Sequence, residues 1–201
     1  TASESRIIVT VDGAPKFFEQ YRMGSFFGDF ELFKRVEVLR GPASSTLYGS
    51  GAIGGTVAFT TKDAGDFLED GETTALRVKT GLESNGETKK LGLIWAQRYG
   101  NAETLAALNF SQGNAIKDGS GTEIAGSEHK SWSGLVKSTW HFGNDDDQTL
   151  TLSLSRTDTD LDDALVAQTG GSAASAFGTN DIHTIDDTVT LTWRNEVADN
   201  P

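Results

Sequence analysis

Three glycines have the spacing of a site that binds the phosphates of a dinucleotide. Gly49, Gly51 and Gly54 match G-x-G-x-x-G, and Asp70 follows about 20 residues later, where such a site holds the ribose. This chemistry needs a helix directly after the glycines, because the phosphate lies on the helix N-terminus. Thr56 to Thr61 are instead rich in β-branched residues, which predicts a strand. No Lys-Ser/Thr pair follows the glycines either, so both phosphate-loop interpretations are rejected.

A run of aspartates offers ligands for a hard cation. Asp158, Asp160, Asp162 and Asp163 lie close in sequence, and Ca²⁺ binds several carboxylates. The glycine turn and the distal glutamate of a calcium loop are missing, although a strand would place Asp158 and Asp160 on one side. We therefore expect solvated carboxylates or counterion contacts and no metal site.

Catalytic chemistry has little support in the sequence. The chain has no cysteine, no G-x-S-x-G elbow and no H-E-x-x-H motif, so we expect no enzyme. Its net charge is −12, which argues against a nucleic-acid partner, since such proteins carry a basic surface. Residues 1–63 hold seven acids and seven bases, so the whole acidic excess lies beyond residue 63.

The glycines stand between two short strand patterns. Val36, Val38 and Leu39 predict a strand that Gly41-Pro42 ends, because proline fixes φ and lacks an amide donor. A turn-rich connector then leads to the strand at Thr56 to Thr61. The predicted layout is strand, glycine elbow, strand.

With these residues the chain resembles the plug domain of a TonB-dependent outer-membrane receptor. The resemblance covers Gly13 to Ala64, the second half of a plug, and its most specific segment is VEVLRGPASSTLYGSGAIGG. RMGSFFGD and GGTVAFTTKDA are most similar to the haem and haemoglobin receptor branch, although Phe30 stands where we expect a proline. The plug motif residues are Arg35, Glu37, Arg40, Gly41, Pro42, Tyr48, Gly49, Gly51, Gly54 and Gly55.

The resemblance implies mechanical roles for this motif. The glycines permit close backbone packing in a compact gate, and Tyr48 is expected to pack inside the plug. Arg35, Glu37 and Arg40 are candidates for ion pairs between plug and barrel, because buried unpaired charges are costly.

Beyond Asp63, apolar and polar residues alternate, as expected for a transmembrane β-barrel. No run of 18 apolar residues is present, so no transmembrane helix is expected. We expect about six antiparallel strands of roughly ten residues each, with residues 105–111 undecided. The side chains expected to face lipid are Leu76, Val78, Thr80 and Leu82; Leu91, Leu93 and Trp95; Trp132, Val136, Trp140 and Phe142; Leu150, Leu152 and Leu154; and Val189, Leu191 and Trp193.

The connections predict an orientation, since such barrels have short periplasmic turns and longer extracellular loops. Turns near Asn101 and at 143–148 are then periplasmic, while 116–130 and 161–184 form outer loops, with a short outer connection at 84–88. In this orientation an aromatic girdle lies at the periplasmic ends of the strands. It consists of Tyr99, Trp140, Phe142 and Trp193.

Histidines are the candidates for contact with a transported ligand. The resemblance implies axial haem ligands of the histidine or tyrosine type. His129 and His183 are expected in outer loops and are the ligand-binding candidates, whereas His141 lies near a periplasmic strand end. None of the three matches a ligand motif of the family.

We therefore expect a mainly β fold that contains the C-terminal half of a plug domain (1–63), a linker (64–73) and the N-terminal part of a barrel (74–201). The chain is expected to be a fragment, because about 22 strands close such a transporter barrel. The implied function is TonB-dependent import of an iron-bearing ligand across the outer membrane of a Gram-negative bacterium. The ligand would be haem, free or from haemoproteins, or alternatively a ferric siderophore or other metal chelate. The implied partners are TonB with its inner-membrane energising complex, haem or a haemoprotein, and outer-membrane lipid, with no intrinsic cofactor. A third possibility, a non-transport β protein, would gain if the predicted lipid-facing leucines did not share one exposed face.

Overall fold

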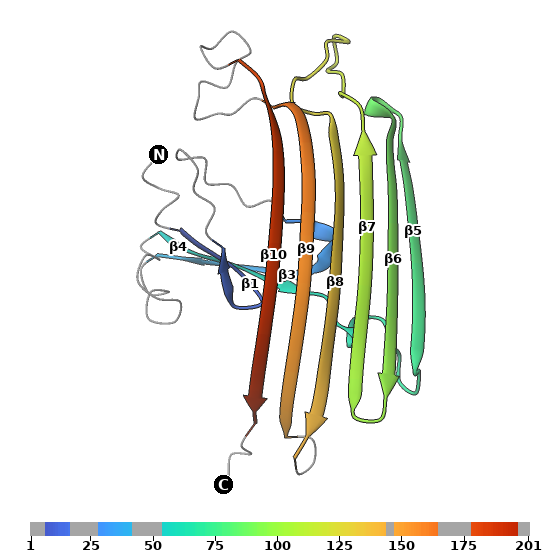
Figure 1. The fold of residues 1–201 in the computed structure, drawn as a ribbon, viewed down its shortest axis with the longest axis vertical. Coiled ribbons are helices and arrows are strands. Elements are labelled where there is room, and N and C mark those ends of the chain that lie inside the picture. The colour runs from blue at the N-terminus through green and yellow to red at the C-terminus, as the bar shows by residue number, and fades with distance from the viewer. Residues whose placement is uncertain (1–6, 17–27, 42–53, 144–146, 165–177, 197–201) are drawn as a thin grey trace.

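The computed structural model describes residues 7–16, 28–41, 54–143, 147–164 and 178–196. These residues form two β-sheets, and the mainly β prediction is confirmed. Figure 1 shows the short strands of the N-terminal sheet crossing behind the long strands of a six-stranded sheet. Four motif residues, Pro42, Tyr48, Gly49 and Gly51, lie outside the described residues.

The N-terminal sheet has the strand order β2-β1-β4-β3. β1 (Ile7–Val11) pairs in parallel with β4 (Gly55–Thr61), and β3 (Phe33–Arg40) pairs antiparallel to β4 on its other side. β1 turns into β2 (Ala14–Lys16) through Asp12 and Gly13, both with positive φ, at 46° and 84°. An Asp-Gly pair suits such a two-residue turn, because its backbone twist matches that of the flanking strands.

Gly55 shows why the elbow must end in glycine. Its φ is +133°, and a Cβ atom added there would lie 2.2 Å from the carbonyl oxygen of Leu39 on the neighbouring strand. The following residues continue as β4 and form no helix, which agrees with the rejection of the dinucleotide interpretation.

The six-stranded sheet is antiparallel, and its strands lie in sequence order. Its successive strands are β5 (Thr74–Glu83), β6 (Thr88–Tyr99), β7 (Ala102–Gly113), β8 (His129–Phe142), β9 (Gln148–Ala164) and β10 (Asn180–Asn195). β6 ends and β7 begins at one end of the sheet, as do β8 and β9, and this end is called the turn end (Figure 1). At the opposite, loop end, β7 is followed by β8 and β9 by β10 after longer stretches of sequence. The predicted alternation of short and long connections is confirmed.

The strands are longer than predicted. β8 has 14 residues, β9 has 17 and β10 has 16, so His129 is the first residue of β8 and His183 lies within β10. The predicted outer loop 116–130 was displaced by two residues, since β7 ends at Gly113 and β8 begins at His129, and the predicted loop 161–184 was too wide. Apolar alternation stops at Arg156 while the backbone pairing with β10 continues to Ala164. The prediction relied on alternating apolar side chains. Because the outward side chains beyond this point are charged, it missed the rest of the strand.

The sheet has an outer face turned away from the N-terminal sheet. Leu76, Val78 and Leu82 on β5 and Val189 and Leu191 on β10 are all exposed there. Three of the four predicted girdle residues, Tyr99, Trp140 and Trp193, lie in one row of register partners at the turn end, which also includes Ala102 and Leu150. The fourth, Phe142, pairs with Gln148 outside this row. The predicted lipid-facing side chains thus share one exposed face, which argues against the third possibility.

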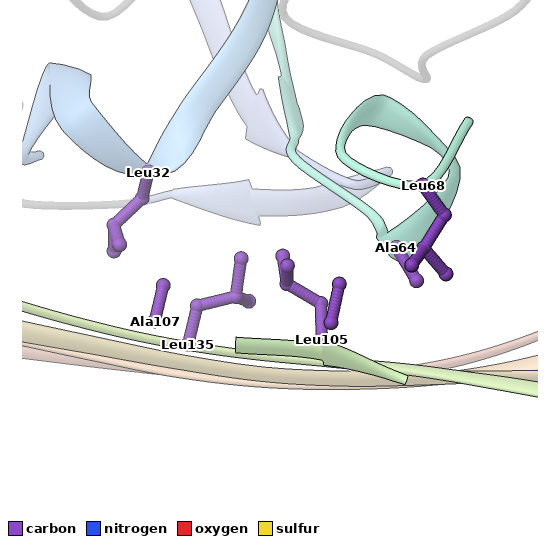
Figure 2. Packing of buried hydrophobic residues seen from close by; sticks show 7 residues of the cluster. Leu32, Ala64, Leu68, Leu105, Ala107 and Leu135 are labelled. Atoms are coloured by element: carbon purple, nitrogen blue, oxygen red, sulfur yellow. The ribbon is translucent and has the colours of Figure 1, made fainter. Parts of the chain in front are cut away.

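The inner face packs against the N-terminal sheet through a small apolar cluster. Leu32, Ala64 and Leu68 point onto Leu105, Ala107 and Leu135 of β7 and β8 (Figure 2). Inward apolar side chains at 105 and 107 explain why residues 105–111 showed no clear alternation. Ala64 and Leu68 come from the segment expected to be a linker.

Among the described residues, helical structure is confined to short 3₁₀ turns. They are η2 (Phe30–Leu32), η4 (Ala64–Asp66) and η5 (Asn85–Glu87). Within the described part of the chain, no helix is both long and apolar enough to cross a membrane.

Candidate functional site

A cavity of about 470 Å³ lies toward the loop end, between η2 and the inner face of the six-stranded sheet. Asp29 and Phe30 form one wall, and Asn109, Ser133 and His129 belong to the opposite wall. We call this space the loop-end cavity. Its walls combine hydroxyl and amide groups with a phenyl ring and an imidazole.

Among the predicted ligand candidates, His129 lines the loop-end cavity. Its Nε2 lies 2.9 Å from Ser111 Oγ, and its Nδ1 lies 3.3 Å from the carbonyl oxygen of Ser127. A carbonyl can only accept, so Nδ1 donates this bond, and in the neutral ring Nε2 accepts from the serine hydroxyl. Nε2 therefore carries the lone pair that could bind a ligand, once Ser111 releases it.

His183, the second candidate, lies on the opposite side of the sheet. It is the register partner of Asp160, while Leu161 is the partner of His129. Because neighbouring residues on a strand point to opposite faces, the two histidines cannot meet in one site. His141 faces inward near the turn end and lines a different cavity.

Asp29, in the η2-side wall of the loop-end cavity, is hydrogen-bonded to the six-stranded sheet. Its carboxylate accepts hydrogen bonds from the Glu31 amide at 2.8 Å, from Asn109 Nδ2 at 3.2 Å and from the Ser133 hydroxyl. Lys79 Nζ reaches Glu31 Oε1 at 2.5 Å, and this hydrogen bond holds the pKa of Glu31 below its ordinary value. Asp29 and Glu31, two residues apart, thus attach η2 to β5, β7 and β8.

A second cavity, of about 950 Å³, lies on the other side of the contact between the sheets and is called the turn-end cavity. Its sheet-side wall is a set of hydroxyl and charged side chains, and its opposite wall includes Phe59 and Lys34. The hydroxyl groups come from Thr139, Thr149, Thr151, Thr190 and Thr192. Such a lining suits water and polar solutes.

The wall of the turn-end cavity that separates it from the loop-end cavity contains a nearly buried ionic network. Asp12 Oδ2 lies 3.7 Å from Lys137 Nζ, and both side chains are 10% exposed. The same carboxylate accepts hydrogen bonds from the Thr61 amide at 2.9 Å and from Ser153 Oγ at 3.2 Å. Sequence reasoning missed this pair, although Lys137 is an inward lysine in a strand, a position that needs a partner.

A second ion pair joins the two sheets at their edges. Lys16 Nζ of β2 lies 2.5 Å from Asp186 Oδ1 of β10 and also donates to the Thr188 hydroxyl. Together with the Asp12 network, this contact fixes the β1–β2 hairpin to three consecutive strands. Neither partner was singled out from the sequence.

The charged motif residues take no part in these ion pairs, although Arg35 and Glu37 line the turn-end cavity. Arg35 Nε is 3.3 Å from Glu37 Oε2 within β3, and both side chains are more than half exposed. Among the described residues, neither they nor Arg40 has an ion pair with the six-stranded sheet, so their expected pairing with a barrel stays a prediction. Gly41 ends β3 with a φ of +89°, and its amide donates to the Gly54 carbonyl at 3.3 Å.

Comparison with known families places residues 2–56 in the TonB-dependent Receptor Plug Domain. The chain is 35% identical over 134 residues to the TonB-dependent heme receptor A of Haemophilus influenzae, a match that covers 66% of this chain and 18% of that protein. It is also 35% identical over 138 residues to the hemin receptor of Yersinia pestis, covering 67% of this chain and 20% of that protein. These relatives are named as receptors and not as enzymes.

Among solved structures, the FrpB iron transporter of Neisseria meningitidis is similar with a TM-score of 0.81 and 23% identity. The similarity covers 96% of this chain and 31% of the transporter. The chain spans about a fifth of the length of the curated relatives that it matches. The two-sheet arrangement is therefore shared with one part of a much longer transporter.

Proposed function

We propose that this chain, a member of the TonB-dependent receptors, is part of a receptor that imports haem through the outer membrane of a Gram-negative bacterium. Residues 1–63 would be the C-terminal half of the plug, 64–73 the linker and 74–201 the first part of the barrel. The observation that carries the choice of ligand is the 35% identity to two receptors named for heme or hemin. Haem is then the transported ligand and no intrinsic cofactor is required.

The loop-end cavity supports a role in receiving the ligand. It lies between η2 and the six-stranded sheet on the side of the long connections, which face outward in barrels of this kind. His129 contributes an imidazole nitrogen, a common iron ligand, and Phe30 contributes an aromatic ring for a flat apolar ligand. We propose His129 as a ligand contact in this part of the receptor.

The layer between the two cavities would act as the closed gate. The Leu32–Leu135 cluster and the Asp12–Lys137 network hold the N-terminal sheet against the wall. TonB, with its inner-membrane energising complex, would supply the force that releases these contacts, and the outer face would rest in lipid. The glycine motif, including Gly41 and Gly55, would keep the gate compact by permitting close strand packing.

Growth on haem tests the proposed function. The receptor that contains this chain is expressed in a Gram-negative host that cannot make haem and lacks its own haem receptors. The expected result is growth on haem that disappears when TonB is deleted. A host that still fails on haem, yet gains iron from a ferric siderophore through the same receptor, would move the chain to the siderophore receptors.

A further inference from the structure

Two carboxylates and one imidazole converge on the outer face of the six-stranded sheet, outside both cavities. Asp158 and Asp160 lie two residues apart on β9, and His183 is the register partner of Asp160 on β10. Side chains at i and i+2 of a strand share a face, as do register partners on neighbouring strands. The backbone pairing, and not a flexible loop, therefore places the three groups together.

The ligand atoms are close enough for one metal ion. His183 Nε2 lies 3.0 Å from Asp158 Oδ1 and 3.9 Å from Asp160 Oδ1, and one ligand atom from each residue lies within 4.8 Å of the others. Zinc bonds of about 2.0–2.2 Å in a tetrahedron need ligand atoms roughly 3.3–3.6 Å apart. His183 and Asp160 are at least half exposed, so small side-chain rotations can close the remaining difference.

Within the described part of the chain, the carboxylates have few direct cationic partners: Lys130 is the register partner of Asp160 on β8 and shares its face, but it forms no ion pair within 4.0 Å with either aspartate. The nearest arginine, Arg156, is already held by Asp187 through two hydrogen bonds of 2.7 and 2.8 Å. Among the described residues, His183 is the only basic side chain within 4.0 Å of Asp158 or Asp160. Asp158 is also 20% exposed and lies in register between Trp132 and Ile185. A carboxylate partly covered by apolar groups is stabilised by a bound cation.

We propose that Asp158, Asp160 and His183 form a binding site for a zinc-class divalent transition-metal ion. One imidazole and two carboxylates favour Zn²⁺ over Ca²⁺ and Mg²⁺, which prefer an all-oxygen set with more ligands. Three protein ligands leave a fourth position open to water. The bound ion would join β9 to β10 near the loop end, beyond the apolar part of the outer face. The site is independent of the proposed haem function.

Zinc titration of the intact receptor tests the proposal. The receptor is purified in detergent without a histidine tag, and Zn²⁺ is titrated against a chromogenic competing chelator. We expect Asp158→Asn and His183→Gln each to weaken one zinc site at least about tenfold. An excess of Ca²⁺ should not displace the zinc from this site.

Asp162→Asn provides the matched control. Asp162 lies two residues beyond Asp160 on the same strand, at the shift in register with β10, and outside the ligand set, so the change removes the same charge as Asp158→Asn without removing a ligand. Its zinc affinity should stay within about twofold of the unmodified receptor. A loss under tenfold in Asp158→Asn or His183→Gln, or an equal loss in Asp162→Asn, would overturn the proposal in favour of no site or of diffuse attraction.

Discussion

Asp12, in the turn of the β1–β2 hairpin, lies 3.7 Å from Lys137 in the middle of β8, and both side chains are 10% exposed. Residues 125 positions apart in the chain thus form a nearly buried ion pair between two sheets. Replacing one partner of such a pair destabilises the fold more than replacing both partners, because the remaining charge stays buried without compensation. This pair is where we expect the contact between the two sheets to be most sensitive to mutation.

Asp12→Asn should loosen the N-terminal sheet strongly. Asparagine tolerates the positive φ of the turn, so the main effect is the isolated lysine charge, at about 3–5 kcal/mol. Amide hydrogen exchange in β1 and β4 should accelerate by about 100-fold or more. The double variant Asp12→Asn/Lys137→Met should recover part of the protection. Equal exchange in the single and double variants would contradict a role for the unpaired charge.

Leu135→Ala should weaken the apolar contact between the sheets. Leu135 is 1% exposed, and truncating a buried leucine costs about 2–5 kcal/mol. Its neighbour Val136 points to the outer face and is 48% exposed, so Val136→Ala is the matched control. Exchange at η2 and η4 should rise in the first variant and stay near normal in the second. Similar exchange in both variants would show that the cluster does not hold the sheets together.

A charged substitution should destabilise the receptor more on the outer face of the sheet than on the inner face. Leu191 lies on this face in β10, whereas the next residue, Thr192, lines the turn-end cavity. Leu191→Arg should destabilise the receptor in lipid bilayers by about 2–4 kcal/mol, and Thr192→Arg by much less. Urea titration of the intact receptor in lipid vesicles measures both values. A reversed order would contradict the assignment of the two faces.

Acid should weaken the contact between η2 and β5. The hydrogen bond from Lys79 lowers the pKa of Glu31 below its ordinary value of 4.5. A lowered folded-state pKa adds stability that is fully present above 4.5 and is lost as the pH falls through the lowered value. The difference in melting temperature between the unmodified receptor and Glu31→Gln should therefore be constant above pH 4.5 and shrink below it. A difference that grew with acid would contradict the Glu31–Lys79 bond.

The sequence predicted the strands correctly where all side chains on one face of the sheet have the same surroundings. The outward leucines of β5, β9 and β10 and the row from Tyr99 to Trp193 were predictable, because one side chain in two meets the same surroundings. The strand after the glycine elbow was predictable from its β-branched residues.

The sequence did not predict the contacts between segments that are far apart in the chain. Leu105 and Leu135 point inward because Leu32 and Leu68 cover them, and this contact has no local signature. The same holds for the Asp12–Lys137 pair. The positions of His129 and His183 were wrong because β8, β9 and β10 continue past the apolar band, where backbone pairing alone carries the strand.

Import of haem by this receptor requires that it bind haem specifically, which a haem titration of the intact receptor in detergent measures through the Soret band in the presence and absence of a ferric siderophore. We predict a saturable spectrum of specifically ligated haem that the siderophore does not suppress. Absence of a specific haem spectrum together with tight binding of the ferric siderophore would contradict the account of the ligand.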